Sequence, residues 1–418
     1  MRFNPALMTM KKFNVLQITQ SLGGGVQKYI TQICEHLDRS RFNITACFSK
    51  DSEKNQQKND IPFPDACRQA DIPYVVVSMQ RAINPWKDFI AFLSVFQQIK
   101  HRGFDIVHAH SSKAGFLARV AARLARVPVV VYSPHAFSFD GPQPVLKKLF
   151  FIFFEKVASL FCDAIIVDSP SEKELALKFK ICREKKITII SPSLKLTDYH
   201  LTITGEEKKE FLRNLGLPTE NRLITMISRL APQKDPLTFI YSAAILKKNF
   251  SDLSFLLVGD GPLMNDCLGM VRKMNLSEEV KLLGWRTDYK TLLQMSDVFV
   301  NPSLWEGLPF ILLEAMIYEK SVVATQATGT KDVIKDSENG FLVPLRSPKH
   351  LADKIKWVLD NPGIAMKIGK EAKKTVEHNY SLEKTTPMIE ELYLQLFNKK
   401  KNPAARKSKK SLNPFTPE

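Results

Sequence analysis

Two glutamates separated by seven residues are the side chains in this sequence best suited to chemistry. Glu306 and Glu314 lie in the stretch 301–316, where an apolar strand runs into a loop and Pro309 suits the first turn of a helix. Glu314 then lies about 7.5 Å beyond Pro309 at 1.5 Å per residue, so one carboxylate is in the loop and the other is on the helix. Ionised carboxylates only accept hydrogen bonds, which suits them to pairs of sugar hydroxyls. The alternative, a helix cap and a surface glutamate, conflicts with the apolar neighbours of Glu314.

Two cations five residues apart form a second candidate group. Arg229 and Lys234 lie in the loop 228–235, which leaves an expected strand. A guanidinium makes a forked contact with phosphate oxygens, whereas an ammonium acts as a point charge. The pair is therefore suited to bracketing a diphosphate, and two solvated surface cations are the alternative.

Glycines and histidines of the N-terminal half form a third group. The glycine run 23–25 follows the first expected strand and opens a helix, where backbone N–H groups can approach an anion; a tight turn is the alternative. His108 and His110 end one expected strand, and His135 follows the next. We expect all three histidines to face a cleft, where imidazole can hydrogen-bond hydroxyls or phosphate, although a lone histidine is more often structural.

Short β-branched runs alternate with helix-period stretches almost from end to end, which predicts parallel sheets covered by helices on both faces. We therefore predict an α/β fold with two doubly wound parallel-sheet, Rossmann-like domains that face a central cleft. Ligands of such sheets bind outside the carboxyl ends of the strands, where the candidate side chains lie. The expected strands are 13–19, 43–48, 73–78, 105–109, 128–133, 163–168 and 187–190, then 222–228, 253–259, 280–284, 297–300, 321–325 and 340–344. The expected helices include 26–37, 114–126, 263–274, 309–318, 348–360 and 364–378.

A polar stretch separates the two series of strands, and we place a hinge near 191–205. We expect an N-terminal domain at 1–200, a C-terminal domain at 201–380, and a helix at 381–397 that crosses back to the N-terminal domain. Residues 398–418 carry seven basic residues and one acid and are expected to be a disordered tail. The tail is either simply solvated or attracted to anionic lipid. Nucleic acid is the weakest option, because no aromatic residues interleave with the basic run.

Composition narrows the class of protein. A chain of 418 residues with 44% apolar residues is not wholly disordered, although its net charge is +17. The six cysteines include no CxxC pair, which argues against a disulfide scaffold or zinc site and fits a reducing compartment. We read no signal peptide, and the most apolar stretch, 149–167, is interrupted by charges and is not a spanning helix. We expect a cytoplasmic protein, peripheral on the cytoplasmic face of the inner membrane.

Two segments of the N-terminal domain could contact that membrane. The segment 146–161 places Lys147 and Lys148 beside five aromatic residues. The segment 115–126 adds three arginines, Arg119, Arg123 and Arg126. We hypothesise that both dock on an anionic leaflet; a helix packed on the sheet is the alternative.

Together these motifs resemble those of the family 4 retaining glycosyltransferases, which have the GT-B architecture of two Rossmann-like domains. The resemblance runs from about residue 13 to 397. Its glutamate pair matches Glu306 and Glu314, its diphosphate-binding cations match Arg229 and Lys234, and the glycine loop and His135 match as well. The segments 81–88 and 105–139 look like those of bacterial transferases that build surface polysaccharide on polyprenyl-diphosphate carriers. The turn at 191–194 departs from the Asn-Gly often found in the family.

The resemblance implies transfer of a sugar from a nucleotide-diphospho-sugar to a lipid-linked or saccharide acceptor, with the anomeric configuration kept. Glu306 would bind the donor sugar and Glu314 the ribose, while the two cations would stabilise the departing diphosphate, so neither a metal nor another cofactor is expected. Trp285 and Arg286 lie where the family places its nucleobase pocket. The implied catalytic residues are His135, Glu306, Arg229 and Lys234. The implied donor-binding residues are Arg229, Lys234, Gly259, Glu306, Gly307, Leu308, Phe310 and Glu314, and the implied acceptor-binding residues are Gly24, Gly25, Arg81, His110 and Lys113.

Two other classes of function stay open. A nucleotide-sugar epimerase or a glycosidase could use the same scaffold, but a hydrolase needs both carboxylates to flank one sugar, and Glu314 is expected at the nucleotide end. A non-catalytic membrane or nucleic-acid adapter would exploit the charge of +17 but would not need the cations and glutamates.

Overall fold

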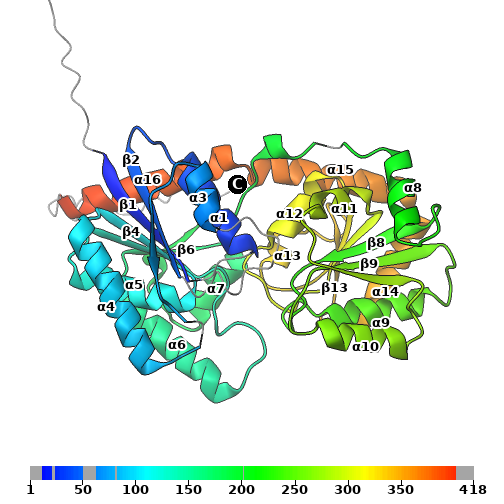
Figure 1. Ribbon diagram of the computed structural model, residues 1–418, viewed down its shortest axis with the longest axis horizontal. Helices are drawn as coiled ribbons and strands as arrows, with labels where there is room; N and C mark the ends of the chain where they lie inside the picture. The colour runs from blue at the N-terminus through cyan, green and yellow to red at the C-terminus, as the bar shows by residue number, and fades with distance from the viewer. Residues whose placement is uncertain (1–11, 21–23, 50–62, 81, 201, 402–418) are drawn as a thin grey trace, which may run out of the picture.

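The structure, a computed structural model, describes residues 12–20, 24–49, 63–80, 82–200 and 202–401. Figure 1 shows two α/β lobes side by side, each built on its own parallel sheet with helices on both faces. The predicted pair of doubly wound parallel-sheet domains is therefore confirmed.

The first sheet has the strand order β3-β2-β1-β4-β5-β6-β7, and every neighbouring pair is parallel. β5 shows why the β-branched runs form strands: Val129 and Val131 enter the hydrophobic core on one face, and Val130 and Tyr132 enter the core on the other. The strands are β1 (Phe13–Ile18), β2 (Phe42–Ser49), β3 (Tyr74–Val77), β4 (Ile106–His110), β5 (Val129–Ser133), β6 (Ala164–Val167) and β7 (Ile187–Ile189).

Helices cover both faces of this sheet. One face packs against α1 (Gly24–His36), α3 (Phe63–Gln69) and α16 (Leu382–Lys401). The other packs against α4 (Pro85–Arg102), α5 (Ser112–Leu124), α6 (Val145–Ser159) and α7 (Pro170–Lys178). A short 3-10 helix, η1 (Glu184–Lys186), precedes β7.

The second sheet has the order β10-β9-β8-β11-β12-β13 and is also parallel throughout. Its strands are β8 (Arg222–Ile227), β9 (Leu253–Val258), β10 (Val280–Gly284), β11 (Val298–Asn301), β12 (Ser321–Thr325) and β13 (Phe341–Val343). Its helices are α8 (Gly205–Asn214), α9 (Pro236–Leu246), α10 (Met264–Lys273), α11 (Tyr289–Met295), α12 (Phe310–Ile317), α13 (Thr330–Val333), α14 (Pro348–Asp360) and α15 (Pro362–Asn379). In the described part of the chain, all strands of both sheets lie within one residue of their expected bounds. Pro309 is the N-cap of α12 and not part of its first turn.

The chain passes between the two lobes twice. The first passage, after β7, contains the 3-10 helix η2 (Leu196–Asp198), and Leu194 forms a parallel bridge with Ser381 of the second passage. α16 then crosses onto the first lobe (Figure 1), where Glu390 accepts a hydrogen bond from the Asp38 amide at 2.7 Å. The helix extends to Lys401, so residues 398–401 belong to it and not to the expected tail. The remainder of that tail, 402–418, lies outside the described residues.

The expectation that Arg119 contributes to a basic surface is wrong. Its side chain is fully buried between α5 and α6, where Nη2 contacts Glu155 Oε2 at 2.9 Å and Nε donates to the Gly115 carbonyl at 2.8 Å. The Tyr132 hydroxyl donates to the other oxygen of Glu155 at 2.8 Å. Arg123 also has a partner, Asp163, at 3.0 Å. None of the helices in the described part of the chain is long and apolar enough to cross a membrane.

Candidate active site

The carboxyl ends of both sheets border one cleft of about 2180 Å³, lined by residues of both lobes. The loops that leave parallel strands lie at this edge, which is why residues far apart in the sequence meet here. The cleft brings together most of the residues that were predicted from the sequence to form the site. They are Gly24, Gly25, Lys113, His135, Arg229, Lys234, Gly259, Glu306, Gly307, Leu308, Phe310 and Glu314.

Lys234 and Glu306 form an ion pair within the second lobe. Their loops leave β8 and β11, and Gln233 joins them: its Nε2 donates to the Trp305 carbonyl at 2.8 Å, and its carbonyl accepts from the Leu304 amide at 2.7 Å. The ammonium and the carboxylate are therefore held together by two loops that are themselves fixed to each other.

Gly259 sets the path of the loop that carries Arg229. Its φ is +128°, and a Cβ there would lie 1.8 Å from the Ser228 carbonyl oxygen. The loops after β8 and β9 are joined by the Leu230 amide, which donates to the Asp260 carbonyl at 2.9 Å. Arg229 is exposed at the wall of the cleft. Only glycine permits this close approach of two backbones.

Glu314 lies on α12 and is buried, with three donors on one oxygen. Oε1 pairs with Lys28 and accepts from the hydroxyls of Tyr199 at 2.7 Å and Tyr289 at 3.0 Å. Burial raises the pKa of Tyr199 well above its ordinary value, and Glu314 raises it further, so this phenol keeps its proton. None of these three donors was among the residues predicted from the sequence. Lys28 had a weak signal, because it follows the glycine run by one helical turn, and the tyrosines had none.

Glycines mark two points where the lobes touch. A Cβ on Gly25 would lie 3.2 Å from the Phe310 ring, and a Cβ on Gly307 would lie 2.7 Å from Asp168 Oδ2 and 3.0 Å from the Ala136 amide nitrogen. Gly24 has a φ of +59°. Gly23 lies outside the described residues.

His135 borders the cleft, but both of its ring nitrogens have partners inside the protein. Nε2 lies 3.0 Å from Nδ1 of His110, and Nδ1 lies 3.4 Å from Oδ2 of Asp168. The backbone at His135 and Ala136 is left-handed, with φ of +52° and +75°. The two contacts of the His135 side chain therefore hold the strained backbone at His135 and Ala136 in place, next to Gly307.

His108 and His110 do not face the cleft, contrary to expectation. Both are fully buried under α16, because their positions on β4 point to that face of the sheet. His110 Nε2 contacts Gln17 at 2.8 Å, Gln17 donates to the Tyr393 hydroxyl at 3.0 Å, and that hydroxyl lies 2.7 Å from His108 Nδ1. Burial lowers the pKa of both imidazoles well below its ordinary value, so both are neutral. His110 does not line the cleft, but it contacts His135, which does.

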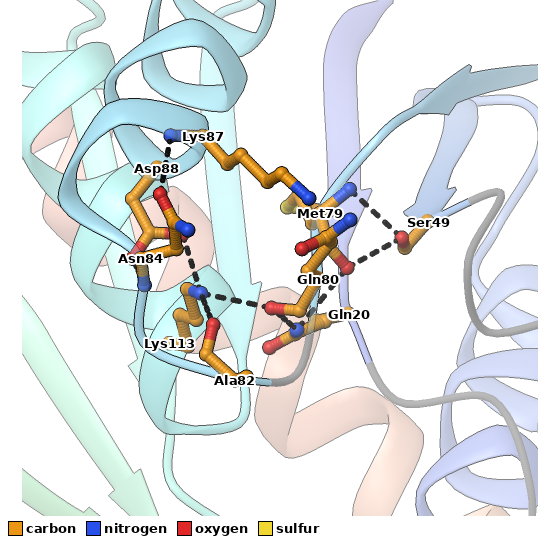
Figure 2. A network of polar contacts seen from close by, with 9 residues as sticks. All are labelled: Gln20, Ser49, Met79, Gln80, Ala82, Asn84, Lys87, Asp88 and Lys113. Carbon is orange, nitrogen blue, oxygen red and sulfur yellow. Dashed lines mark hydrogen bonds and ion pairs between the residues drawn. The ribbon is translucent and has the colours of Figure 1, made fainter.

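Lys113 lines the cleft, but its ammonium is used within the first lobe (Figure 2). It donates to the carbonyls of Gln80 at 2.8 Å and Ala82 at 2.5 Å, and it pairs with Asp88 at the start of α4. Gln20 donates to the Met79 carbonyl at 3.2 Å from the other side. These contacts hold Met79, Gln80, Ala82 and Asp88 in place. Arg81 lies outside the described residues.

Trp285 and Arg286 also line the cleft. The Arg286 guanidinium makes a forked contact with Asp288, at 2.8 and 2.6 Å. Trp285 Nε1 is buried and has no hydrogen-bond partner among the described residues. An unpaired buried donor is costly unless a ligand or water accepts from it.

An anion bound in this site would face two cations, Arg229 and Lys234, and the start of α12. Pro309 has no N–H, so the available amides begin at Phe310. Within the part of the chain that the structure describes, no group of three or more His, Cys, Asp or Glu side chains is placed to hold a metal ion.

Comparison with known proteins finds relatives over almost the whole chain. Residues 24–193 match the family model "Glycosyl transferase 4-like domain" and residues 207–375 match "Glycosyl transferases group 1". An Escherichia coli protein named UDP-Gal:alpha-D-GlcNAc-diphosphoundecaprenol alpha-1,3-galactosyltransferase is 32% identical over 375 residues, 89% of this chain and 94% of that protein. A Campylobacter jejuni protein named N,N'-diacetylbacillosaminyl-diphospho-undecaprenol alpha-1,3-N-acetylgalactosaminyltransferase is 26% identical over 81% of this chain and 88% of its own length.

Solved structures confirm the GT-B fold. Anabaena Alr3699/HepE in complex with UDP-glucose superposes with a TM-score of 0.76 at 20% identity, over 91% of this chain and 99% of that one. Sucrose-phosphate synthase from Thermosynechococcus elongatus gives 0.74 at 19% identity, over 93% and 100%.

Proposed function

This chain belongs to the glycosyltransferase family that these comparisons identify, and we propose that it transfers a sugar from a nucleotide-diphospho-sugar to an acceptor carried on a polyprenyl diphosphate, retaining the anomeric configuration. The observation that carries the proposal is that Arg229, Lys234, Glu306 and Glu314 line the same cleft. Two relatives support the acceptor class, because both are named for acceptors linked to diphosphoundecaprenol. Since the matched families are transferases, transfer is favoured over the epimerase, hydrolase and adapter alternatives.

The donor would lie along the second lobe. Negative charge grows on the diphosphate as its bond to the sugar breaks, so fixed cations at Arg229 and Lys234 lower the barrier selectively. Glu306 would accept from hydroxyls of the donor sugar and Glu314 from those of the ribose. The amides of Leu308, Phe310 or Ile311 would complete the diphosphate site, and neither a metal nor another cofactor is part of this proposal.

The ion pair between Lys234 and Glu306 supports this assignment, because it holds both charges in place before the donor arrives. Preorganised charges need little rearrangement at the moment of reaction. His135 would border the reacting centre. To contact the sugar it must exchange one of its two hydrogen bonds, and the longer one, 3.4 Å to Asp168, is the weaker.

The acceptor would enter from the first lobe. Gly24 and Gly25 keep the start of α1 free of side chains at the wall of the cleft, so the acceptor or the diphosphate could approach the backbone. Lys113 would act through Gln80, Ala82 and Asp88, which it holds in place, and His110 would act through His135. Arg81 is kept as a proposed acceptor-binding residue.

We further propose that the first lobe docks on an anionic membrane, at the cytoplasmic face. α4 and α6 leave large apolar side chains in water: Trp86 is 73% exposed and Leu146 is 83% exposed. Lys87 and Lys147 lie among them, as lysines do where a helix lies on anionic lipid. Pro85 and Asp88 of α4 and Lys147, Phe150 and Phe154 of α6 also line the cleft, so the cleft borders this apolar surface. The exposed apolar residues are Ile83, Trp86, Phe89, Ile90, Leu93, Val145, Leu146, Leu149, Phe150, Phe153 and Phe154.

Flotation with vesicles of acidic lipid tests the docking surface. The double variant Lys147→Glu and Lys148→Glu, and the variant Leu146→Ser, should both lose vesicle binding. Met366→Ser is the matched control, because Met366 is also an exposed apolar residue but lies on the second lobe. Undiminished binding of the surface variants would refute the membrane proposal.

Incubation with radiolabelled UDP-, GDP- and ADP-sugars and bacterial membranes tests the activity. We expect label in the lipid fraction, unaffected by EDTA, and NMR of the product should show the anomeric configuration of the donor. Glu314→Ala should lose incorporation while staying folded. Epimerised nucleotide sugar, cleaved glycan or complete inertness would each overturn the proposal.

A further inference from the structure

Lys28 is the residue by which the first lobe reaches the carboxylate of Glu314 in the second. α1 opens at Gly24, and Lys28 lies one turn further on. Its ammonium pairs with Glu314 Oε1 and donates to the Tyr199 hydroxyl at 2.5 Å. The contact joins residues 286 positions apart in the chain.

The ammonium is surrounded by groups of the second lobe and of the first passage between the lobes. It lies 5.1 Å from the centroid of the Phe310 ring and 5.3 Å from that of Tyr199. The side chain of Lys28 is 25% exposed and that of Glu314 is 3% exposed. A cation on aromatic faces beside a buried carboxylate is held more strongly than one in a surface ion pair.

The donors around Glu314 all use the same oxygen. Lys28, Tyr199 and Tyr289 converge on Oε1. Among the described residues, every hydrogen bond of this carboxylate is made by Oε1. The plane of the carboxylate is thus fixed from one side, and Oε2 is left for a ligand hydroxyl at the wall of the cleft.

We propose that Lys28 is a positioning residue for nucleotide binding, which holds Glu314 so that Oε2 meets the ribose hydroxyls. The inference rests on the proposed function, because it takes Glu314 as the ribose-binding carboxylate. Lys28 belongs to the other lobe, so it orients Glu314 only while α1 lies against α12. Nucleotide binding and the contact between the lobes therefore strengthen each other, as linkage requires.

Calorimetric titration of the full chain tests this, using whichever of UDP, GDP and ADP raises the melting temperature of the wild type. Lys28→Met should raise the Kd about tenfold, the size expected for one hydrogen bond to a charged group. The donor KM should rise with it, while kcat at saturating donor stays within about threefold. Lys28→Arg should restore most of the affinity, because it keeps the charge. Lys248→Met, at an exposed lysine far from the cleft, is the control.

Three comparisons keep the inference apart from the proposed function. A wild-type or tighter Kd in Lys28→Met, together with lost binding in Glu314→Ala, would overturn the inference and leave the proposed donor site standing. Normal binding in Glu314→Ala would overturn the donor site itself. Tyr289→Phe removes a donor to Oε1 without touching the first lobe, so it should weaken nucleotide binding even if Lys28→Met folds poorly, and an unchanged Kd would count against the positioning role.

Discussion

Replacing Lys234 by methionine tests the contribution of its ammonium to the stability of the fold and, separately, to catalysis. The Lys234 side chain is 19% exposed and that of Glu306 is 8% exposed. Exposed ion pairs contribute about 0–1 kcal/mol, whereas removing one partner of a buried pair costs about 3–5 kcal/mol. This pair lies between the two limits, so we expect Lys234→Met to lower the free energy of unfolding by about 2 kcal/mol.

The effect on catalysis is separate and larger. Loss of one preorganised group aimed at developing charge costs about 3 kcal/mol, or roughly a hundredfold in kcat. Denaturant titration measures the stability, and single-turnover transfer at saturating donor measures kcat. Lys248→Met again serves as the control for loss of one positive charge.

The double variant Lys234→Met and Glu306→Gln decides between the two effects. It removes the unpaired buried carboxylate, so about 1 kcal/mol or more of the lost stability should return. Its kcat should stay at or below that of the single variant, because the charge opposite the leaving diphosphate is still missing. Recovery of kcat in the double variant, or a kcat within threefold of wild type in the single one, would refute the role of Lys234.

Three further variants probe contacts around the cleft and the core. Gly307→Ala places a Cβ 2.7 Å from Asp168 Oδ2, so overpacking should lower the free energy of unfolding by about 1–3 kcal/mol and slow transfer; turnover equal to wild type would contradict the tight contact. Tyr393→Phe removes the hydroxyl that accepts from Gln17, and the stranded buried groups should cost about 1–3 kcal/mol in urea unfolding. Burial lowers the pKa of Lys320 from 10.5 to about 8, so the unfolded chain binds more protons between these values. Stability relative to Lys320→Met should therefore rise with pH in that window, by up to about 1.36 kcal/mol per pH unit; a flat difference would show that Lys320 titrates normally.

Much of the fold could be predicted because its cause is local. In a parallel sheet covered on both faces, each strand is a continuous apolar run, as β5 is, and such a run is visible without knowing its neighbours. The positions of Arg229, Lys234 and Glu306 follow from the same cause, since each lies in a loop just after a strand. Their meeting in one cleft is a consequence of strand order.

The failures concern side chains whose partners are distant in the chain. From the sequence Arg119 was predicted to be a surface charge, because its partner, Glu155, lies on another helix, α6. His108 and His110 were predicted to face the cleft, because nothing near them in the sequence indicates that α16 covers them. Tyr393 of α16, which contacts His108, is 285 residues away. The spacing of residues along one helix or strand gives its faces, but it does not say which face another element will cover. For the same reason the contact between Lys28 and Glu314, 286 residues apart, could not be predicted, although the place of Lys28 after the glycine run was a weak signal.

The crossing of α16 onto the first lobe has a consequence for how the protein is made. Ile389, Tyr393 and Phe397 complete a core whose other members begin at Val15. On the ribosome, the first lobe cannot close that core until the whole of the second has been synthesised. Until then Gln17 and His108 lack their partner, so the nascent lobe is exposed to chaperones and proteases for longer than its own length requires. A premature stop codon ahead of residue 389 should therefore damage the lobe that was translated first.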